Sequence, residues 1–206
     1  MITQESELLI NSINLLEKFY SSNISASKFG INFEKLWKKI INNNLKLHPI
    51  YEIHLFGELY LDYDSYRKKP DYKDYQINEI ELKSRCLEVI KAIVLLNPLL
   101  KNRINSLKIL SKIYSINEIK KRLSKNGRIF LLSKLISGKK AILNVIWITF
   151  NINTKSYFVS IEKWPVKFNE KKERHPQRIE YGFTNLKSLL NYLDNNKYIK
   201  VKESII

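Results

Sequence analysis

The stretch IFLLSKLISGKKAILNVIWITFNINTKSYFVSIEKW, from Ile129 to Trp164, decides the fold class of this chain. It contains three runs rich in β-branched and aromatic residues, 129–136, 141–150 and 157–164, separated by short connections of turn-forming residues. Runs of this length and composition are typical of β-strands, and connections this short join antiparallel neighbours. The stretch therefore predicts an antiparallel meander of about three strands.

Helical periodicity dominates the sequence on the N-terminal side of this stretch. Apolar residues recur every three or four positions over 9–20, 33–41 and 82–94, which predicts three amphipathic helices. Two further helices are expected over 100–113 and 115–126, the second opening on a Ser-x-x-Glu capping box. These two helices carry many lysines and arginines, so the middle of the chain is predicted to be both helical and basic.

Two segments complete the predicted layout. Residues 51–64 are expected to be extended, because apolar and aromatic residues lie around Gly57, namely Leu55, Leu59, Tyr60 and Leu61. After the meander, a short strand over 179–183 and a helix over 184–193 close the chain. The order of elements lacks a regular strand–helix alternation, so the predicted class is α+β.

The length of 206 residues is compatible with one compact domain over 1–206. The alternative is a subdivision into a helical, partly acidic part, 1–98, and a basic α+β part, 99–206.

Composition excludes several classes of protein. With 44% hydrophobic and 12% aromatic residues the chain is expected to fold, and five glycines leave no phosphate-binding or dinucleotide-binding loop. We therefore expect no cofactor, apart from Mg²⁺ under the nuclease interpretation given below. Cys86 has no partner for an intrachain disulfide, and no signal peptide or membrane segment is recognisable. A cytoplasmic protein is expected.

Positive charge is concentrated in the second half of the chain. The formal net charge is +16, yet residues 51–90 carry 6 basic and 9 acidic side chains. Residues 91–206 carry 24 basic and 7 acidic side chains, and 101–140 hold 12 basic residues with Glu118 as the only acid. Such an excess of basic over acidic residues predicts an anionic partner. DNA or RNA, with its repeated phosphates, is the simplest candidate. The alternative is a lysine-coated surface produced by coding bias toward A and T.

The candidate nucleic-acid-binding residues all lie in this basic part, most of them on the two predicted helices and the hairpin turn that follows. They are Lys108, Lys112, Lys120, Lys121, Arg122, Lys125, Arg128, Lys139 and Lys140, joined by Arg174 and Arg178 from a charged loop. Trp164, Phe168, Tyr181 and Phe183 flank that loop. Exposed rings beside cations can stack on unpaired bases, although rings in a domain of this size are also needed for packing.

A different chemistry is suggested by the acidic segment. Pro70-Asp71, followed by Glu81-Leu82-Lys83, resembles the signature of the PD-(D/E)xK nuclease superfamily over about residues 51–97. The resemblance implies a Mg²⁺-dependent nuclease, with Asp71 and Glu81 as catalytic carboxylates and Lys83 at the attacking water. Two carboxylates suit this reaction because they hold the metal that activates water and offsets phosphate charge.

The nuclease interpretation depends on local structure. If 77–83 is a strand, Glu81 and Lys83 share one face, and Asp62 could replace Asp71 as a metal ligand beside Glu81. If the helix over 82–94 begins earlier, Glu81 and Lys83 point about 200° apart and the acids mark a helix N-terminus. A third function is also open: an interaction or inhibitor module whose basic face meets an acidic protein.

Overall fold

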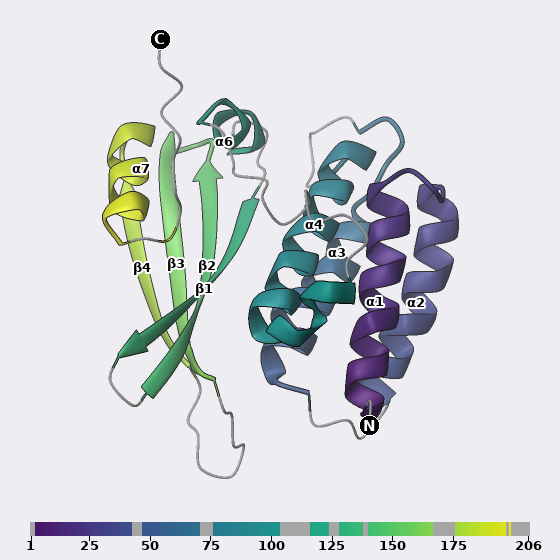
Figure 1. The fold of residues 1–206 in the computed structure, drawn as a ribbon. Helices are drawn as coiled ribbons and strands as arrows, with labels where there is room; N and C mark the ends of the chain where they lie inside the picture. Colours follow the sequence, from purple (N-terminus) through teal and green to yellow (C-terminus); the bar gives the residue numbers. More distant parts are fainter. Residues whose placement is uncertain are drawn as a thin grey trace. The chain divides into compact units, whose positions relative to one another are not determined.

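The computed structural model describes residues 3–42, 47–70, 76–103, 116–123, 128–137, 140–166, 176–196 and 198. The chain divides into two compact units, Met1–Leu110 and Ser111–Ile206. The first is helical and the second combines a sheet with two helices (Figure 1), so the chain belongs to the α+β class predicted above.

The first unit is built from helices of three kinds. Its elements are α1 (Gln4–Tyr20), α2 (Ala26–Asn42), the π-helix η1 (Tyr51–Gly57), α3 (Glu58–Asp64), α4 (Glu79–Leu96) and the 3₁₀-helix η2 (Pro98–Arg103). The three amphipathic helices expected from periodicity are present as α1, α2 and α4. Of the helix expected over 100–113, the described residues form the end of η2, and the remainder lies outside the described part of the chain.

Aromatic side chains form the centre of this helical unit. The ring of Phe29 on α2 stacks on Phe19 of α1 at a centroid distance of 4.4 Å and on Phe33 at 5.4 Å. All three rings are fully buried, and α1 also packs along α4 (Figure 1). Burying rings of this size supplies much of the hydrophobic stabilisation that a bundle of short helices requires.

The prediction of an extended segment over 51–64 is wrong, because this segment forms η1 and α3. Its buried side chains include Tyr51, Leu55, Leu59 and Asp62, which recur every three or four residues as on a helix face. Asp62 conceals this pattern in the sequence, because a carboxylate is not expected on a buried stripe.

The second unit is an antiparallel sheet with helices before and after it. Its elements are α6 (Ile116–Leu123), β1 (Arg128–Ser137), β2 (Lys140–Asn151), β3 (Ser156–Pro165), β4 (Gln177–Phe183) and α7 (Leu186–Asn195). The strand order is β1-β2-β3-β4, so each strand pairs with its neighbour in sequence. The predicted meander is confirmed, and the short strand predicted over 179–183 extends it.

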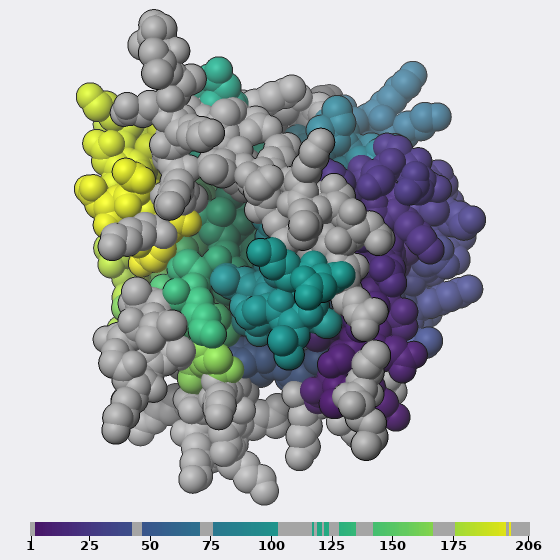
Figure 2. Space-filling view, in the orientation of Figure 1, coloured from purple at the N-terminus to yellow at the C-terminus, as the bar shows by residue number. Residues whose placement is uncertain are grey.

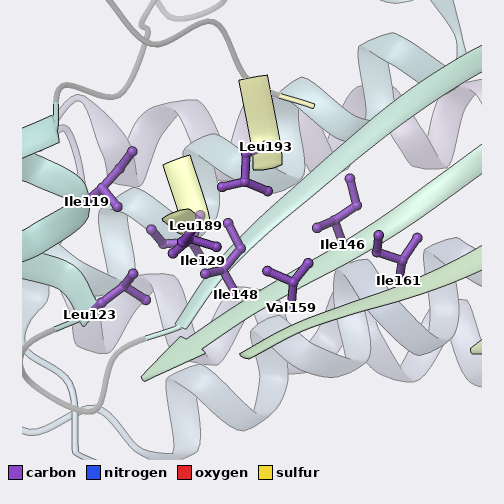
Figure 3. Packing of buried hydrophobic residues seen from close by; sticks show 9 residues of the cluster. All are labelled: Ile119, Leu123, Ile129, Ile146, Ile148, Val159, Ile161, Leu189 and Leu193. Carbon is purple, nitrogen blue, oxygen red and sulfur yellow. The ribbon is translucent and has the colours of Figure 1, made fainter. Parts of the chain in front are cut away.

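Both helices of this unit cover the same face of the sheet. The core between them contains Ile119 and Leu123 of α6, Leu189 and Leu193 of α7, and Ile129, Ile146, Ile148, Val159 and Ile161 of the strands. Figure 3 shows these side chains meeting between helices and sheet. Figure 2 shows α7, in yellow, at the surface of this unit. Since strand residues alternate between faces, the opposite face carries the intervening residues.

Candidate nucleic-acid interface

The two units differ strongly in charge. Residues 1–110 carry 16 basic and 13 acidic side chains, a net of +3, whereas residues 111–206 carry 20 basic and 7 acidic ones, a net of +13. The positive charge noted in the sequence therefore belongs mainly to the unit that contains the sheet. An anionic ligand is expected to be attracted to this unit.

The structure describes the side chains of only some of the predicted binding residues. Lys120 and Arg122 lie on α6, Arg128 begins β1, and Arg178 lies on β4, where it pairs with Glu180 at 2.8 Å. Lys120 and Arg178 are exposed, while Arg122 and Arg128 are partly buried. Lys108, Lys112, Lys125, Lys139 and Arg174 lie outside the described residues, and for Lys121 and Lys140 only the backbone is described.

Two of these arginines are held in place by the fold. The guanidinium of Arg122 donates a hydrogen bond to the backbone carbonyl of Arg128 at 3.3 Å, which joins α6 to the start of β1. The guanidinium of Arg128 lies over the ring of Trp147 on β2, 4.8 Å from its centroid. A cation in this position is attracted to the face of the indole ring. The Arg128 side chain therefore has less conformational freedom in the unbound protein.

The aromatic residues predicted to flank a base-binding loop have different surroundings. Tyr181 and Phe183 lie on the helix-covered face, where their rings contact Tyr192 of α7 at 4.9 and 5.1 Å. Trp164 is buried and its indole N–H donates to Glu162 at 3.2 Å, while Phe168 lies outside the described residues. For the three described rings, packing is the role that the structure shows.

The strand over 77–83 that the nuclease interpretation requires is not formed, because Glu79 begins α4. The Asn78 side chain accepts a hydrogen bond from the Glu81 backbone N–H at 3.0 Å, and the Glu81 carboxylate accepts one from the Asn78 N–H at 2.9 Å. This reciprocal pair is a capping box, which satisfies backbone donors that the helix leaves free. The helix N-terminus, the alternative left open by the sequence, is what the structure contains.

We expect Asn78→Ala to lower the free energy of unfolding of the helical unit by about 1 kcal/mol, because the first turn of α4 loses its cap. Urea unfolding followed by circular dichroism measures the change. Glu81→Gln is the matched control, since an amide oxygen can still accept the hydrogen bond from the Asn78 N–H. Equal stability of Asn78→Ala and the unmodified chain would show that the cap contributes nothing.

Lys83 and Asp62, two further residues of the nuclease interpretation, have structural partners as well. The ammonium of Lys83 lies 2.7 Å from Glu79 and donates to the hydroxyl of Ser22 at 2.9 Å. Asp62 is buried on α3, where its carboxylate lies 3.4 Å from the guanidinium of Arg85. Asp71 lies outside the described residues.

Among the residues that the structure describes, no group of three or more His, Cys, Asp and Glu side chains could hold a metal ion. Because the segment that would align Glu81 with Lys83 as a strand is helical from Glu79 onward, nucleic-acid cleavage is not part of the function proposed below.

The single cysteine is not a candidate nucleophile. Cys86 lies on α4 and its side chain is completely buried. Burial raises the pKa of its thiol well above the ordinary value, because the thiolate would lose its hydration. The reactive thiolate is therefore scarce at neutral pH.

No protein-family model, curated protein sequence or solved structure matches this chain significantly. In the part of the chain that the structure describes, no helix combines the length and apolar character needed to cross a bilayer.

Proposed function

We propose that this protein binds nucleic acid through contacts between the phosphate backbone and the cations of its sheet-containing unit. The observation that carries the proposal is the net charge of +13 on residues 111–206, against +3 on residues 1–110. Lysine and arginine side chains neutralise phosphates and release condensed counterions, which favours binding irrespective of base sequence.

The placement of the described cations favours binding without sequence specificity. Exposed basic residues occur on several elements of this unit: Lys120 on α6, Lys134 on β1, Arg178 on β4 and Lys187 on α7. Contacts distributed in this way suit a flexible or extended polyanion, because phosphates recur at short intervals along either DNA or RNA.

The proposal predicts binding that weakens steeply with salt. We expect the full chain to bind mixed-sequence DNA and RNA at low ionic strength, with an affinity that falls as salt is raised. Lys120→Glu with Lys134→Glu should reduce the affinity about tenfold and make the salt dependence shallower, because fewer counterions are released. Fluorescence anisotropy of a labelled oligonucleotide over a series of salt concentrations measures both quantities.

The matched control reverses two lysines of the helical unit. Lys35 and Lys39 are exposed on α2, so Lys35→Glu with Lys39→Glu changes the net charge of the chain by the same amount. We expect this control to bind almost as tightly as the unmodified protein. If both double variants lose affinity equally, overall charge rather than the sheet-containing unit is responsible, and absence of binding at every salt concentration contradicts the proposal.

A further inference from the structure

The sheet face opposite α6 and α7 carries an exposed aromatic ring, that of Phe158, near the β2–β3 turn. The strand register places Arg128, Thr149, Phe158 and Gly182 on one rung across all four strands. We call these four residues the Phe158 rung. Phe158 is 39% exposed, although phenylalanine usually lies in the interior.

The neighbours of Phe158 on its rung leave space beside the ring. Thr149 and Gly182, the directly opposite residues on β2 and β4, are small and both are exposed. A Cβ atom added at Gly182 would lie 3.8 Å from Phe158 Cε1, an ordinary contact distance, so the ring lies beside the glycine without crowding it. A bulky residue at either position would cover part of the ring that is now accessible.

Positive charge and a second aromatic ring lie on or beside the Phe158 rung. Arg128 lies on the Phe158 rung and its guanidinium covers Trp147, whose centroid is 4.8 Å from that of Phe130. Lys155, in the turn that joins β2 to β3, is also exposed. The rung thus combines an accessible ring with nearby cations. Proteins that bind single-stranded nucleic acid use the same combination, because bases stack on the ring and cations attract the phosphates.

Two acidic residues of the same face, Glu180 and Glu162, each interact with a neighbouring side chain. Glu180 lies one rung away from Phe158 and forms an ion pair with Arg178 at 2.8 Å. Glu162 accepts a hydrogen bond from Trp164 at 3.2 Å.

We propose that Phe158 stacks on an unpaired base while Arg128 contacts the adjacent phosphate, so that the ligand is single-stranded nucleic acid. This inference rests on the proposed function and specifies its ligand. Bases of a duplex are already stacked on both sides, whereas an unpaired base can add its face to an exposed ring. Stacking of this kind tolerates any base, in agreement with phosphate-directed binding.

The neighbouring strand, β4, supplies a matched control for Phe158 on β3. Tyr181 lies on β4 with nearly the same exposure, 38%, but on the helix-covered face, where it contacts Tyr192. Phe158→Leu and Tyr181→Leu therefore each remove one half-exposed ring from opposite faces of the sheet. Phe158→Tyr keeps a ring at the proposed site.

The test titrates the full-length chain with oligothymidylate of about 15 nucleotides and with a duplex of the same length. We expect Phe158→Leu to weaken binding of the single strand by about 5- to 150-fold, the usual effect of losing one stacked ring. Duplex binding should remain unchanged. Tyr181→Leu and Phe158→Tyr should bind the single strand as the unmodified protein does, and thermal unfolding confirms that each variant is folded.

The outcomes separate this inference from the proposed function. If Phe158→Leu binds the single strand normally while Lys120→Glu with Lys134→Glu binds it weakly, phosphate binding stands and base stacking at Phe158 is wrong. An equal loss for single strand and duplex, or an equal loss in Tyr181→Leu, also overturns it. If the unmodified chain retains neither oligonucleotide at low salt, both proposals fail.

Discussion

Arg85→Met is expected to lower the free energy of unfolding of the helical unit by about 3–5 kcal/mol, the usual result of breaking a buried ion pair. Arg85 on α4 is 5% exposed and lies between two buried carboxylates. Its guanidinium is 3.4 Å from Asp62 on α3 and 3.2 Å from Glu88 on its own helix. Without the arginine, both carboxylates would lose a charged hydrogen-bonding partner in a site that water reaches poorly, which is the main cost.

Amide hydrogen exchange of α4 measures this effect, because protection of its amides reports the stability of the helical unit. A triple variant, Arg85→Met with Asp62→Asn and Glu88→Gln, tests the cause. It removes the carboxylate charges together with the arginine, so we expect it to recover part of the lost stability. A triple variant as unstable as Arg85→Met would show that lost packing, not the loss of the charge–charge contacts with Arg85, explains the effect.

An exposed ion pair provides the comparison. Lys38 and Glu34 on α2 lie only 2.8 Å apart, closer than either contact of Arg85, and both side chains are exposed. We nevertheless expect Lys38→Ala to change the stability little, because water solvates the remaining carboxylate. The contrast tests whether burial, rather than separation, determines the cost of breaking an ion pair in this unit.

Gly57→Ala is the second substitution with a large expected effect, a loss of about 1–3 kcal/mol. Gly57 ends η1, where a Cβ atom would lie 2.5 Å from the backbone carbonyl oxygen of Glu52. That oxygen belongs to the same helix and is fixed by the backbone, so the π-helical turn must distort to admit a methyl group. The glycine therefore permits the close approach of backbone atoms on which η1 depends.

Gly182→Ala in β4 serves as the control for this substitution. The nearest heavy atom to an added Cβ at Gly182 is 3.8 Å away, an ordinary contact distance. Thermal unfolding of both variants should show a large loss for Gly57→Ala and a small change for Gly182→Ala. Equal changes would indicate that the intrinsic preference of alanine over glycine, and not the contact with Glu52, controls the result.

Elements with a uniform local pattern could be predicted from the sequence. The strands β1, β2 and β3 are runs rich in β-branched and aromatic residues, and short polar turns separate them, so the sequence predicts the meander that the structure contains. The apolar stripes of α1, α2 and α4 likewise have the helical period. In these segments the local preference and the tertiary environment agree, which makes the sequence pattern a sufficient guide.

Residues 51–64 were mispredicted because tertiary partners override their local pattern. Asp62 interrupts the apolar stripe, and its ion pair with Arg85 on another helix helps to explain why a carboxylate is buried there. At the start of α4, Glu81 has the residue type and spacing of a nuclease motif, yet its carboxylate caps Asn78. A motif three residues long cannot specify whether the surrounding backbone is a strand or a helix.

The candidate binding site likewise has one feature that the sequence predicts and one that depends on the tertiary structure. Excess positive charge after residue 90 is a property of composition, and the boundary between the units assigns most of it to residues 111–206. Phe158 was not recognised in the sequence, because its exposure depends on the small residues opposite it, Thr149 and Gly182, and on which face α7 covers. Tyr181, one strand away, has a ring of similar exposure on the other face.

Sequence was sufficient for the α+β class, for the meander and for the basic character of the C-terminal half, since these follow from local periodicity and from counting charges. Tertiary structure decided that residues 51–64 are helical, that Arg85 is buried between two acids, and that Phe158 is exposed among small neighbours. Each of these depends on residues that are distant in sequence but adjacent in space, and no local pattern records such neighbours.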